Sequence, residues 1–422
     1  MDFQEHLKSY LSNKEIEELS NSLLEENKHA VLLNPRKMSD ETFLSLFPHV
    51  SKHPIVKHAY IYDKKEYELG KSIYHALGCF YLQEPSAMIP AYLLKADEND
   101  IVLDMCAAPG GKSIQTAFLM NNAGLIISND LSRSRVSAIV ENVERLGIGN
   151  IVITSNDLST ISNKYLNSFD KIILDAPCSG SGMFRKDDKM IKDWSYNKVI
   201  KFAETQKQLI SIAYNMLKPG GTICYSTCSF SKEEDEDVIK YLLDNSDAEL
   251  LPIEDNTLFY VNKKESYGVH LFPNRFPGEG HYICLIKKPG ISSNKNTKTT
   301  VYNNKFNLPF NFIDKYGDFL FGSNTDFNLK YFNIVRKGVK IGELIKDEIK
   351  YDYHYAHYVD TFKLIHQLNE DELKHYMLGE TLPANLEKGY YLLTYKDINV
   401  DIAKCDGRLM KNHLPKGLRN KF

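Results

Sequence analysis

The sequence predicts an α/β fold in which a parallel sheet is covered by helices on both faces. From about residue 97 to residue 288, short apolar runs alternate with segments of helical periodicity. Alternation of this kind is typical of parallel sheets, in which each crossover is a helix. A glycine-rich loop follows the first apolar run, and a polar stretch separates the region from the rest of the chain. We expect a small α+β unit before the sheet and an α+β domain after it.

Each expected element has its own signal in the sequence. Short runs rich in Ile, Val and Leu predict buried strands at 101–103, 125–128, 151–153, 172–174 and 222–225. Helices are expected at 112–120 and where Val136, Ile139, Val140 and Val143 recur at helical spacing. The aromatic and apolar residues that predict the first unit are Phe43, Phe47, Val56, Tyr60 and Tyr62. The predicted organisation is 1–84 for the N-terminal unit, 85–290 for the α/β domain, 291–300 for a polar linker and 301–422 for the C-terminal domain.

Composition excludes several classes of protein. With 422 residues and 43% hydrophobic residues, the chain can bury two or three cores. We read no secretory signal at the N-terminus and no run of the roughly 20 apolar residues that a membrane helix needs. The seven cysteines are an odd number without C-x-x-C pairs, which argues against disulfides and against a zinc site. We therefore expect a cytoplasmic protein with no metal and no membrane partner.

Charge supports nucleic-acid binding only locally. The formal net charge is −3, so the chain as a whole is not basic. The last nineteen residues, 404–422, carry six basic side chains against Asp406 alone. Such a basic tail either contacts phosphates or is simply solvated, and the solvated case is the commoner one.

The loop after the first strand has the composition of a ligand-binding turn. It reads Cys106-Ala107-Ala108-Pro109-Gly110-Gly111-Lys112, and small residues here let backbone N–H groups approach a ligand at the helix N-terminus. It matches neither the P-loop nor the G-x-G-x-x-G pattern. Asp130 follows the second strand and could accept hydrogen bonds from a ribose diol. The competing interpretation, in which Asp130 or Ser132 caps the next helix, is equally well supported.

Two cysteines directly follow predicted core strands. Cys178 lies in Asp175-Ala176-Pro177-Cys178, and Cys228 lies in Ser226-Thr227-Cys228-Ser229. If the two strands are neighbours, both thiols lie at the same edge of the sheet, and covalent chemistry is indicated. The alternative for any single cysteine is a buried apolar role, which we predict for Cys224 and Cys284.

Read together, these motifs resemble the Nop/Sun family of RNA cytosine-5 methyltransferases. The resemblance rests on residues 106–112, on Asp-Ala-Pro-Cys-Ser-Gly-Ser-Gly at 175–182, and on Tyr-Ser-Thr-Cys-Ser at 225–229. An entry segment at 80–88 and a basic end at 411–419 are also similar, the latter to the RsmF type that modifies small-subunit ribosomal RNA. The resemblance implies a Rossmann-like S-adenosylmethionine-dependent methyltransferase sheet, with RNA-binding units at both ends of the chain.

The family also implies roles for individual residues. Residues 106–112 would surround the methionine and ribose of S-adenosylmethionine, Asp130 would take the ribose hydroxyls, and Arg135 would lie beside it. Asp157 would reach the adenine amine, although a plain loop turn is the simpler interpretation of Ser155-Asn156-Asp157. Cys228 would be the nucleophile that attacks carbon 6 of cytosine. Asp175 would bind the base and line the cofactor site, Cys178 would assist release, and Lys112 would touch the base or hold Asp175.

Three alternatives remain open at this point. DNA cytosine methyltransferases use the cysteine of a Pro-Cys pair, which would make Cys178 the attacking thiol. A transfer-RNA methyltransferase would share the same chemistry. A ribosome-assembly factor that binds RNA without turnover is a third possibility, although it would not need Cys228, Asp175 and Lys112 together. We expect RNA, and most simply ribosomal RNA or the small ribosomal subunit, as the partner, with a cytidine taken out of its stack.

Overall fold

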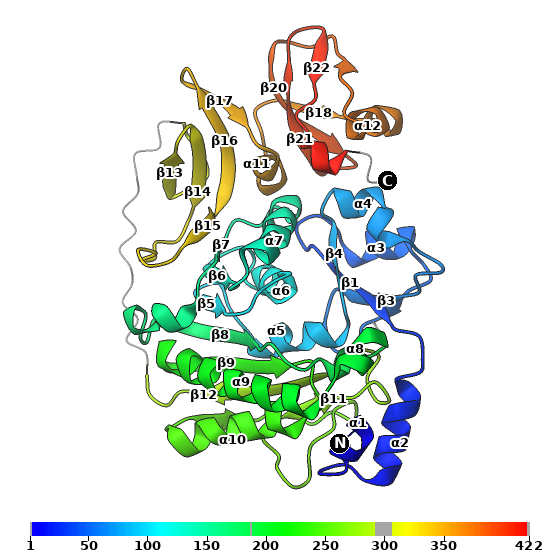
Figure 1. The fold of residues 1–422 in the computed structure, drawn as a ribbon. Helices are drawn as coiled ribbons and strands as arrows, with labels where there is room; N and C mark the ends of the chain where they lie inside the picture. The colour runs from blue at the N-terminus through cyan, green and yellow to red at the C-terminus, as the bar shows by residue number, and fades with distance from the viewer. Residues whose placement is uncertain (1, 186–187, 292–305, 420–422) are drawn as a thin grey trace.

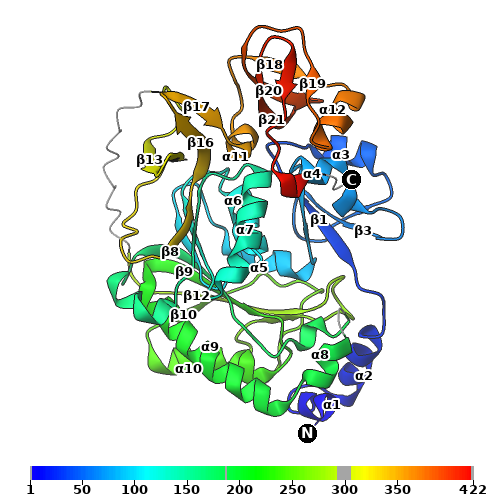
Figure 2. The same ribbon diagram turned by 45° about the horizontal axis from the view of Figure 1, so that its top comes forward.

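The structure is a computed structural model that describes residues 2–185, 188–291 and 306–419. A central sheet with its helices occupies the middle of the molecule (Figure 1). The N-terminal sheet and the C-terminal sheets lie together on one side of it, and the first two helices lie near α8 on the other side (Figure 2).

The central sheet has nine strands, of which β11 lies off the main path. The strands are β5 (Ile101–Asp104), β6 (Leu125–Asn129), β7 (Ile151–Thr154), β8 (Phe169–Asp175), β9 (Leu217–Thr227), β10 (Glu249–Leu251), β11 (Val269–Leu271), β12 (His281–Lys287) and β15 (Ile334–Lys337). Their order is β10-β12-β9-β8-β5-β6-β7-β15. The five strands from β7 to β9 in this order are parallel, and the flanking strands β12 and β15 are antiparallel to their neighbours. The five predicted strands are therefore confirmed as a parallel sheet.

Helices cover both faces of this sheet. The helices of this unit are α5 (Ile89–Leu94), α6 (Gly111–Leu119), α7 (Arg133–Leu146), α8 (Asp188–Asp193), α9 (Tyr196–Met216) and α10 (Glu236–Asn245). Ile114 of α6 and Val136 of α7 pack in one core with Val102, whereas Ile210 of α9 packs in a second core with Leu103. Successive strand residues thus face opposite cores, as the pleat of a strand requires. Both predicted helices are confirmed.

The N-terminal unit is a four-stranded antiparallel sheet preceded by two helices. Its elements are α1 (Phe3–Leu7), α2 (Asn13–Ser22), β1 (His29–Leu33), α3 (Asp40–Leu46), β2 (Ser51–Lys52), β3 (Ala59–Tyr62), α4 (Ile73–Ala76) and β4 (Phe80–Gln83), with sheet order β2-β3-β1-β4. A capping box between Ser12 and Glu15 starts α2. Leu7 and Leu19 pack on Phe230 and Phe272, so the first helices belong to the surface of the α/β unit rather than to the N-terminal sheet.

The C-terminal part contains two further sheets. Its elements are β13 (Phe312–Tyr316), β14 (Phe319–Ser323), β16 (Val339–Ile345), β17 (Glu348–Tyr351), α11 (Tyr353–Tyr358), β18 (Ile365–Gln367), α12 (Glu370–Met377), β19 (Leu382–Pro383), β20 (Gly389–Tyr395), β21 (Ile398–Cys405) and β22 (Leu409–Lys411). The sheet orders are β13-β14-β16-β17 and β18-β20-β21-β22-β19. The second sheet shares a core with the N-terminal unit, in which Phe43 and Tyr60 pack with Tyr376 and Leu393. The N-terminal sheet and the second C-terminal sheet therefore form one block on the same side of the central sheet (Figure 2).

Three features bear on the predicted organisation of the chain. The proposed linker, 291–300, lies outside the described residues except for Ile291. Strand β15 comes from the expected C-terminal domain but pairs with β7 of the central sheet. The basic segment that we read as a tail is folded over residues 404–419, since Lys404 lies in β21, Lys411 lies in β22 and Leu414 is 1% exposed. Among the described helices, none is long and apolar enough to cross a bilayer.

Candidate active site

The two cysteines of interest meet because their strands are parallel neighbours. Strands β8 and β9 pair so that Asp175 lies opposite Ser226, and both strands end at the same edge of the sheet. The segments that follow carry Cys178 and Cys228, whose Sγ atoms lie 3.0 Å apart. The expected meeting of the two thiols is thus confirmed.

A buried lysine and a carboxylate lie at the same edge. Lys112 is in the first turn of α6, and its Nζ donates to Oδ2 of Asp175 at 2.7 Å. Ser226 Oγ donates to Oδ1 of Asp175 at 2.8 Å, and His281 Nε2 lies 3.8 Å from that oxygen. The Lys112 side chain is 9% exposed and that of Asp175 is 32% exposed, so the carboxylate is the member of the pair that a ligand can reach.

Charge is distributed unevenly in this cluster. Desolvation opposes ionisation of Asp175, but the Lys112 ammonium and His281 outweigh it and lower the pKa of Asp175. The hydrogen bond to Cys228, together with burial, raises the pKa of Cys178 well above its usual value. Burial lowers the pKa of Lys112, but the negative charge of Asp175 outweighs that effect and raises it.

The glycine loop is tied to the end of β6. Ala107 N donates to the Asn129 carbonyl at 2.7 Å, and Ala108 N donates to Oδ2 of Asp130 at 3.1 Å. Arg135 donates to the Ala108 carbonyl at 2.6 Å and lies 3.5 Å from Oδ2 of Asp130. Gly110 has a φ of +108°, a conformation that L side chains rarely adopt, so glycine is required at this turn. The loop thus reaches α6 with its backbone held close to the carboxylate.

Asp130 is not the N-cap of the following helix, and its binding to the cofactor ribose stays a prediction. Ser132, not Asp130, occupies the N-cap position of α7, and no side-chain cap bond is formed there. The Asp130 oxygens accept the N–H groups of Ser132 and Ala108, which leaves each oxygen with a lone pair to accept a further donor. Neighbouring Asp104 has a buried Oδ1 without a hydrogen-bond partner, and burial raises the pKa of that carboxyl to about 7. These oxygens fit the hydroxyl and ammonium donors of S-adenosylmethionine.

Other predicted residues are placed differently. Cys106 is partly buried against the second core, and burial raises its pKa, so its thiol is poorly reactive. Asp157 is exposed, and it accepts from the Ser159 N–H and hydroxyl, as the plain loop-turn interpretation expects. Its contact with adenine stays a prediction. Cys224 and Cys284 are buried in the sheet, as predicted.

Sequence reasoning missed two residues at this edge. His281 starts β12, and it reaches Asp175 because β12 pairs antiparallel with β9. Glu234 accepts hydrogen bonds from Ser179 and Ser229, which follow the two cysteines. No local motif marks His281. Glu234 lies in the charged run 232–237, which resembles an exposed segment, so the local sequence gives no signal of its burial.

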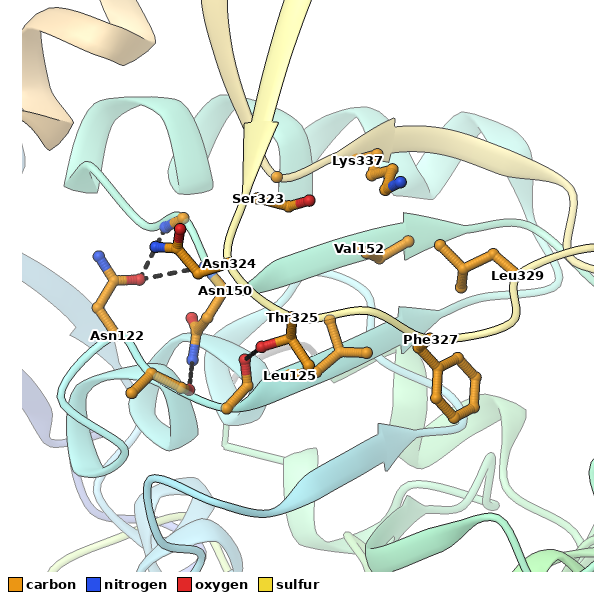
Figure 3. Close-up of a pocket in the computed structure, with 14 residues that line it drawn as sticks. Asn122, Leu125, Asn150, Val152, Ser323, Asn324, Thr325, Phe327, Leu329 and Lys337 are labelled. Atoms are coloured by element: carbon orange, nitrogen blue, oxygen red, sulfur yellow. Dashed lines mark hydrogen bonds between the residues drawn. The ribbon is translucent and has the colours of Figure 1, made fainter. Parts of the chain in front are cut away.

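One cavity of about 270 Å³ lies far from this edge (Figure 3). It lies between the start of β6, at Leu125, and the segment that carries Thr325, whose hydroxyl donates to the Gly124 carbonyl at 2.8 Å. Leu125 pairs with Ile101, the first residue of β5. The cavity is therefore at the amino edge of the parallel strands, opposite the cysteines, and ligands of open α/β sheets bind at the carboxyl edge.

Among the described residues, one group combines three side chains that can ligate metals. It comprises Asp235, Glu236 and His270, all buried. His270 Nε2 and Glu236 Oε1 lie 2.9 Å apart, and Asp235 accepts from the Thr227 hydroxyl at 2.6 Å. The expectation of no metal stays a prediction.

A parallel sheet with a glycine loop after β5 and an acidic residue after β6 is an α/β fold that binds a nucleotide-like ligand at its carboxyl edge. Together with the thiol pair and the match to a methyltransferase family, it places the chain among the S-adenosylmethionine-dependent methyltransferases. Comparison with known families agrees along the chain. Residues 1–85 match the N-terminal domain of 16S rRNA methyltransferase RsmF, 91–287 match 16S rRNA methyltransferase RsmB/F, and 363–420 match the methyltransferase RsmF PUA domain.

Individual proteins support the same assignment. The ribosomal RNA small subunit methyltransferase F of Shewanella piezotolerans is 30% identical over 92% of this chain and 90% of its own length. The protein of that name from Shewanella woodyi is 32% identical over 84% of this chain and 81% of its own. A methyltransferase homologue from Pyrococcus horikoshii superposes with a TM-score of 0.60 at 29% identity, covering 67% of this chain and 93% of its own. The chain therefore belongs to the RsmB/F family of RNA cytosine-5 methyltransferases, which use S-adenosylmethionine, and it has the N-terminal and PUA domains of the RsmF type.

Proposed function

We propose that this protein methylates carbon 5 of a cytidine in 16S ribosomal RNA, with Cys228 as the nucleophile. The observation that carries the proposal is the cluster at the ends of β8 and β9, where the two thiols are 3.0 Å apart beside the Lys112–Asp175 ion pair. The likeness to small-subunit methyltransferases over 92% of the chain favours ribosomal RNA over transfer RNA. Because this substrate is made and processed in the cytoplasm, we place the protein there.

The proposed mechanism begins with covalent activation of the base. The Cys228 thiolate adds to carbon 6, forming a C–S bond, and the electron pair of the carbon 5–carbon 6 bond becomes available at carbon 5. Bound S-adenosylmethionine supplies an electrophilic methyl group for that carbon. The buried Lys112 ammonium belongs to the same cluster as the two thiols. Membership of the RsmB/F family favours the RNA-type assignment, with Cys228 as the nucleophile, over the DNA-type alternative.

Asp175 would select the base. Lys112 keeps Asp175 ionised, and a carboxylate accepts a hydrogen bond from the exocyclic amine of cytosine. Uracil presents a carbonyl oxygen at that position, which a carboxylate would repel. The same ion pair therefore provides both positioning and discrimination.

Release requires the proton on carbon 5 to leave. In the adduct the Cys228 sulfur is a neutral thioether, so the interaction with Cys228 that raises the pKa of Cys178 is lost. Cys178 can then release its proton to solvent, and its sulfur can accept the carbon 5 proton. The electrons of that C–H bond restore the double bond, and the C–S bond breaks with its electron pair on Cys228. The short distance between the two sulfur atoms supports this division of roles.

A groove in the C-terminal part supports RNA as the partner. It has a volume of about 520 Å³ and lies between β17 and the sheet of β20, β21 and β22. Its lining carries four lysines against one glutamate, and the residues are Ile345, Lys346, Glu348, Lys350, Tyr390, Lys404, Lys411 and His413. The Lys404 ammonium lies 5.1 Å from the centroid of the Tyr390 ring. Lysines beside an aromatic ring suit phosphates and a stacked base. We infer that RNA crosses this groove.

Bisulfite sequencing of 16S ribosomal RNA tests the proposal. RNA from cells that lack the gene should contain an unmodified cytidine that is methylated in cells with the wild-type gene. A gene encoding Cys228→Ala should fail to restore the mark. Complete 16S methylation without the gene, together with loss of methylation in transfer RNA, would contradict the proposal.

A further inference from the structure

A buried acid links the segments that carry the two cysteines. The run Lys232-Glu233-Glu234-Asp235-Glu236-Asp237 spans a short 3₁₀ turn and the start of α10. Glu234 and Asp235 are 0% exposed, and Glu236 is 1% exposed. Among the residues that the structure describes, no ion pair neutralises Glu234. A carboxylate in such a place is stable only when hydrogen bonds replace its water shell.

Both oxygens of Glu234 are occupied by donors. Oε1 accepts from Ser179 N at 2.8 Å and from Gln206 Nε2 at 3.2 Å. Oε2 accepts from the hydroxyls of Ser179 and Ser229, the latter at 2.6 Å. Burial raises the pKa of Glu234 above its usual value, and these donors lower it only in part. Because all the partners donate, they stabilise the carboxylate form.

The donors belong to the two catalytic segments. Ser179 follows Cys178 and Ser229 follows Cys228, so one carboxylate holds both segments. Gln206 of α9 also donates to the Pro177 carbonyl at 2.8 Å. The segments are joined further by Gly182 N, which donates to the Cys228 carbonyl at 2.8 Å.

We propose that Glu234 is a positioning residue that sets the distance between the two thiols. The proposal rests on the proposed function, in which Cys228 attacks and Cys178 accepts the carbon 5 proton. Glu234 contacts neither sulfur and acts through Ser179 and Ser229. When this link is lost, attack by Cys228 can still occur, but transfer of the proton to Cys178 becomes slow because it depends on the placement of both segments. The adduct between protein and RNA then persists.

The experiment compares Glu234→Gln with wild type in methyl transfer to 16S ribosomal RNA. The amide NH₂ of the variant would face the groups of Ser179, Ser229 and Gln206 that donate to the carboxylate in wild type. We expect kcat to fall about tenfold or more, since small misplacements of reacting groups cost up to about 100-fold in rate. The KM for RNA and the affinity for S-adenosylmethionine should stay within about twofold. The fraction of protein in a denaturant-resistant adduct should rise. Glu234→Asp keeps the charge and should recover part of kcat.

Glu236→Gln is the matched control, because Glu236 is an equally buried neighbour whose partners are His270 and Asn262. It should change thermal stability without raising the adduct fraction.

If Glu234→Gln does not fold, Ser179→Ala and Ser229→Ala test the same link and should each raise the adduct fraction. The proposal would be overturned if folded Glu234→Gln had the kcat and the adduct fraction of wild type. It would also be overturned if Glu234→Gln and Glu236→Gln lost kcat to the same extent. Wild-type protein without methyl transfer to any RNA would instead overturn the proposed function.

Discussion

The Sγ atoms of Cys178 and Cys228 lie 3.0 Å apart, although 50 residues separate them in the chain. Their contact follows from the parallel pairing of β8 and β9, which ends both strands at one edge. The surroundings make the thiols unequal, because the pKa of Cys178 is raised while Lys112 places a positive charge near Cys228. Replacing each thiol should therefore block a different step of the reaction.

Cys228→Ser should abolish both methylation and covalent capture of RNA, because a hydroxyl does not readily supply the anionic nucleophile. Cys178→Ser should still attack and methylate once but release slowly, so an adduct should accumulate. Denaturing gels of both variants with substrate RNA and S-adenosylmethionine provide the measurement. An adduct with Cys228→Ser but not with Cys178→Ser would reverse the assignment and favour the DNA-type arrangement.

Asp130→Ala should weaken binding of S-adenosylmethionine by more than about 1 kcal/mol, because a charge-assisted hydrogen bond to the ribose would be lost. Calorimetric titration of the folded variant measures the change. Asp157→Ala is the comparison, and its smaller expected loss reflects an exposed side chain already bonded to Ser159. Equal affinities for wild type and Asp130→Ala would show that Asp130 only organises the loop through Ala108.

The parallel core and the cysteine pair could be predicted from sequence because both depend on local signals. Strands β5 to β9 are short apolar runs, and chain direction alone brings residues that follow parallel strands to one edge. His281 could not be found in this way, since its place depends on the antiparallel pairing of β12. The burial of Glu234 could not be predicted, because a run of acidic residues usually indicates a solvent-exposed segment. Here Ser179, Ser229 and Gln206 supply the hydrogen bonds that water would otherwise give.

The C-terminal part was less predictable for a different reason. Several of its elements pack against other units, so their burial depends on long-range contacts. Strand β15 joins the edge of the central sheet, and Tyr376 packs with Phe43 of the N-terminal unit. Neither contact leaves a periodic pattern in the local sequence.

Lys112→Met should move the acidic limb of the pH profile to higher pH. Without the ammonium, the largest contribution that lowers the pKa of Asp175 is lost while His281 still opposes burial, so this pKa rises. Because the proposed mechanism needs ionised Asp175, activity then disappears at a higher pH as the pH falls. Profiles of kcat/KM, each normalised to its own maximum, report this free-enzyme pKa. Lys207→Met, on the outer helix α9, is the control. If the acidic limb of Lys112→Met did not shift, ionised Asp175 would not be required for activity.

The same ion pair predicts how stability depends on pH. The folded-state pKa of Asp175 is lowered, so its contribution is fully present above the unfolded-state pKa of about 3.9. It is lost as the pH falls from there through the folded-state value. Acid unfolding of wild type and Lys112→Met should therefore differ most above pH 4 and converge at lower pH. Parallel stability curves across this range would contradict the assigned ion pair.

The groove between β17 and the C-terminal sheet should provide phosphate contacts for RNA. Deleting residues 404–422 does not test this cleanly, because the deletion removes β22 and the end of β21. The double variant Lys350→Gln/Lys411→Gln removes two exposed charges and keeps the strands. RNA affinity should fall several-fold, and the slope of log affinity against log salt should decrease by about 1.4 for two contacts to a single strand. Affinity for S-adenosylmethionine should not change.

Lys240→Gln/Lys374→Gln, at exposed positions outside the groove, is the matched control with equal loss of charge. Equal slopes for the two double variants would show that the groove lysines act only through net charge, and RNA would then have to bind elsewhere.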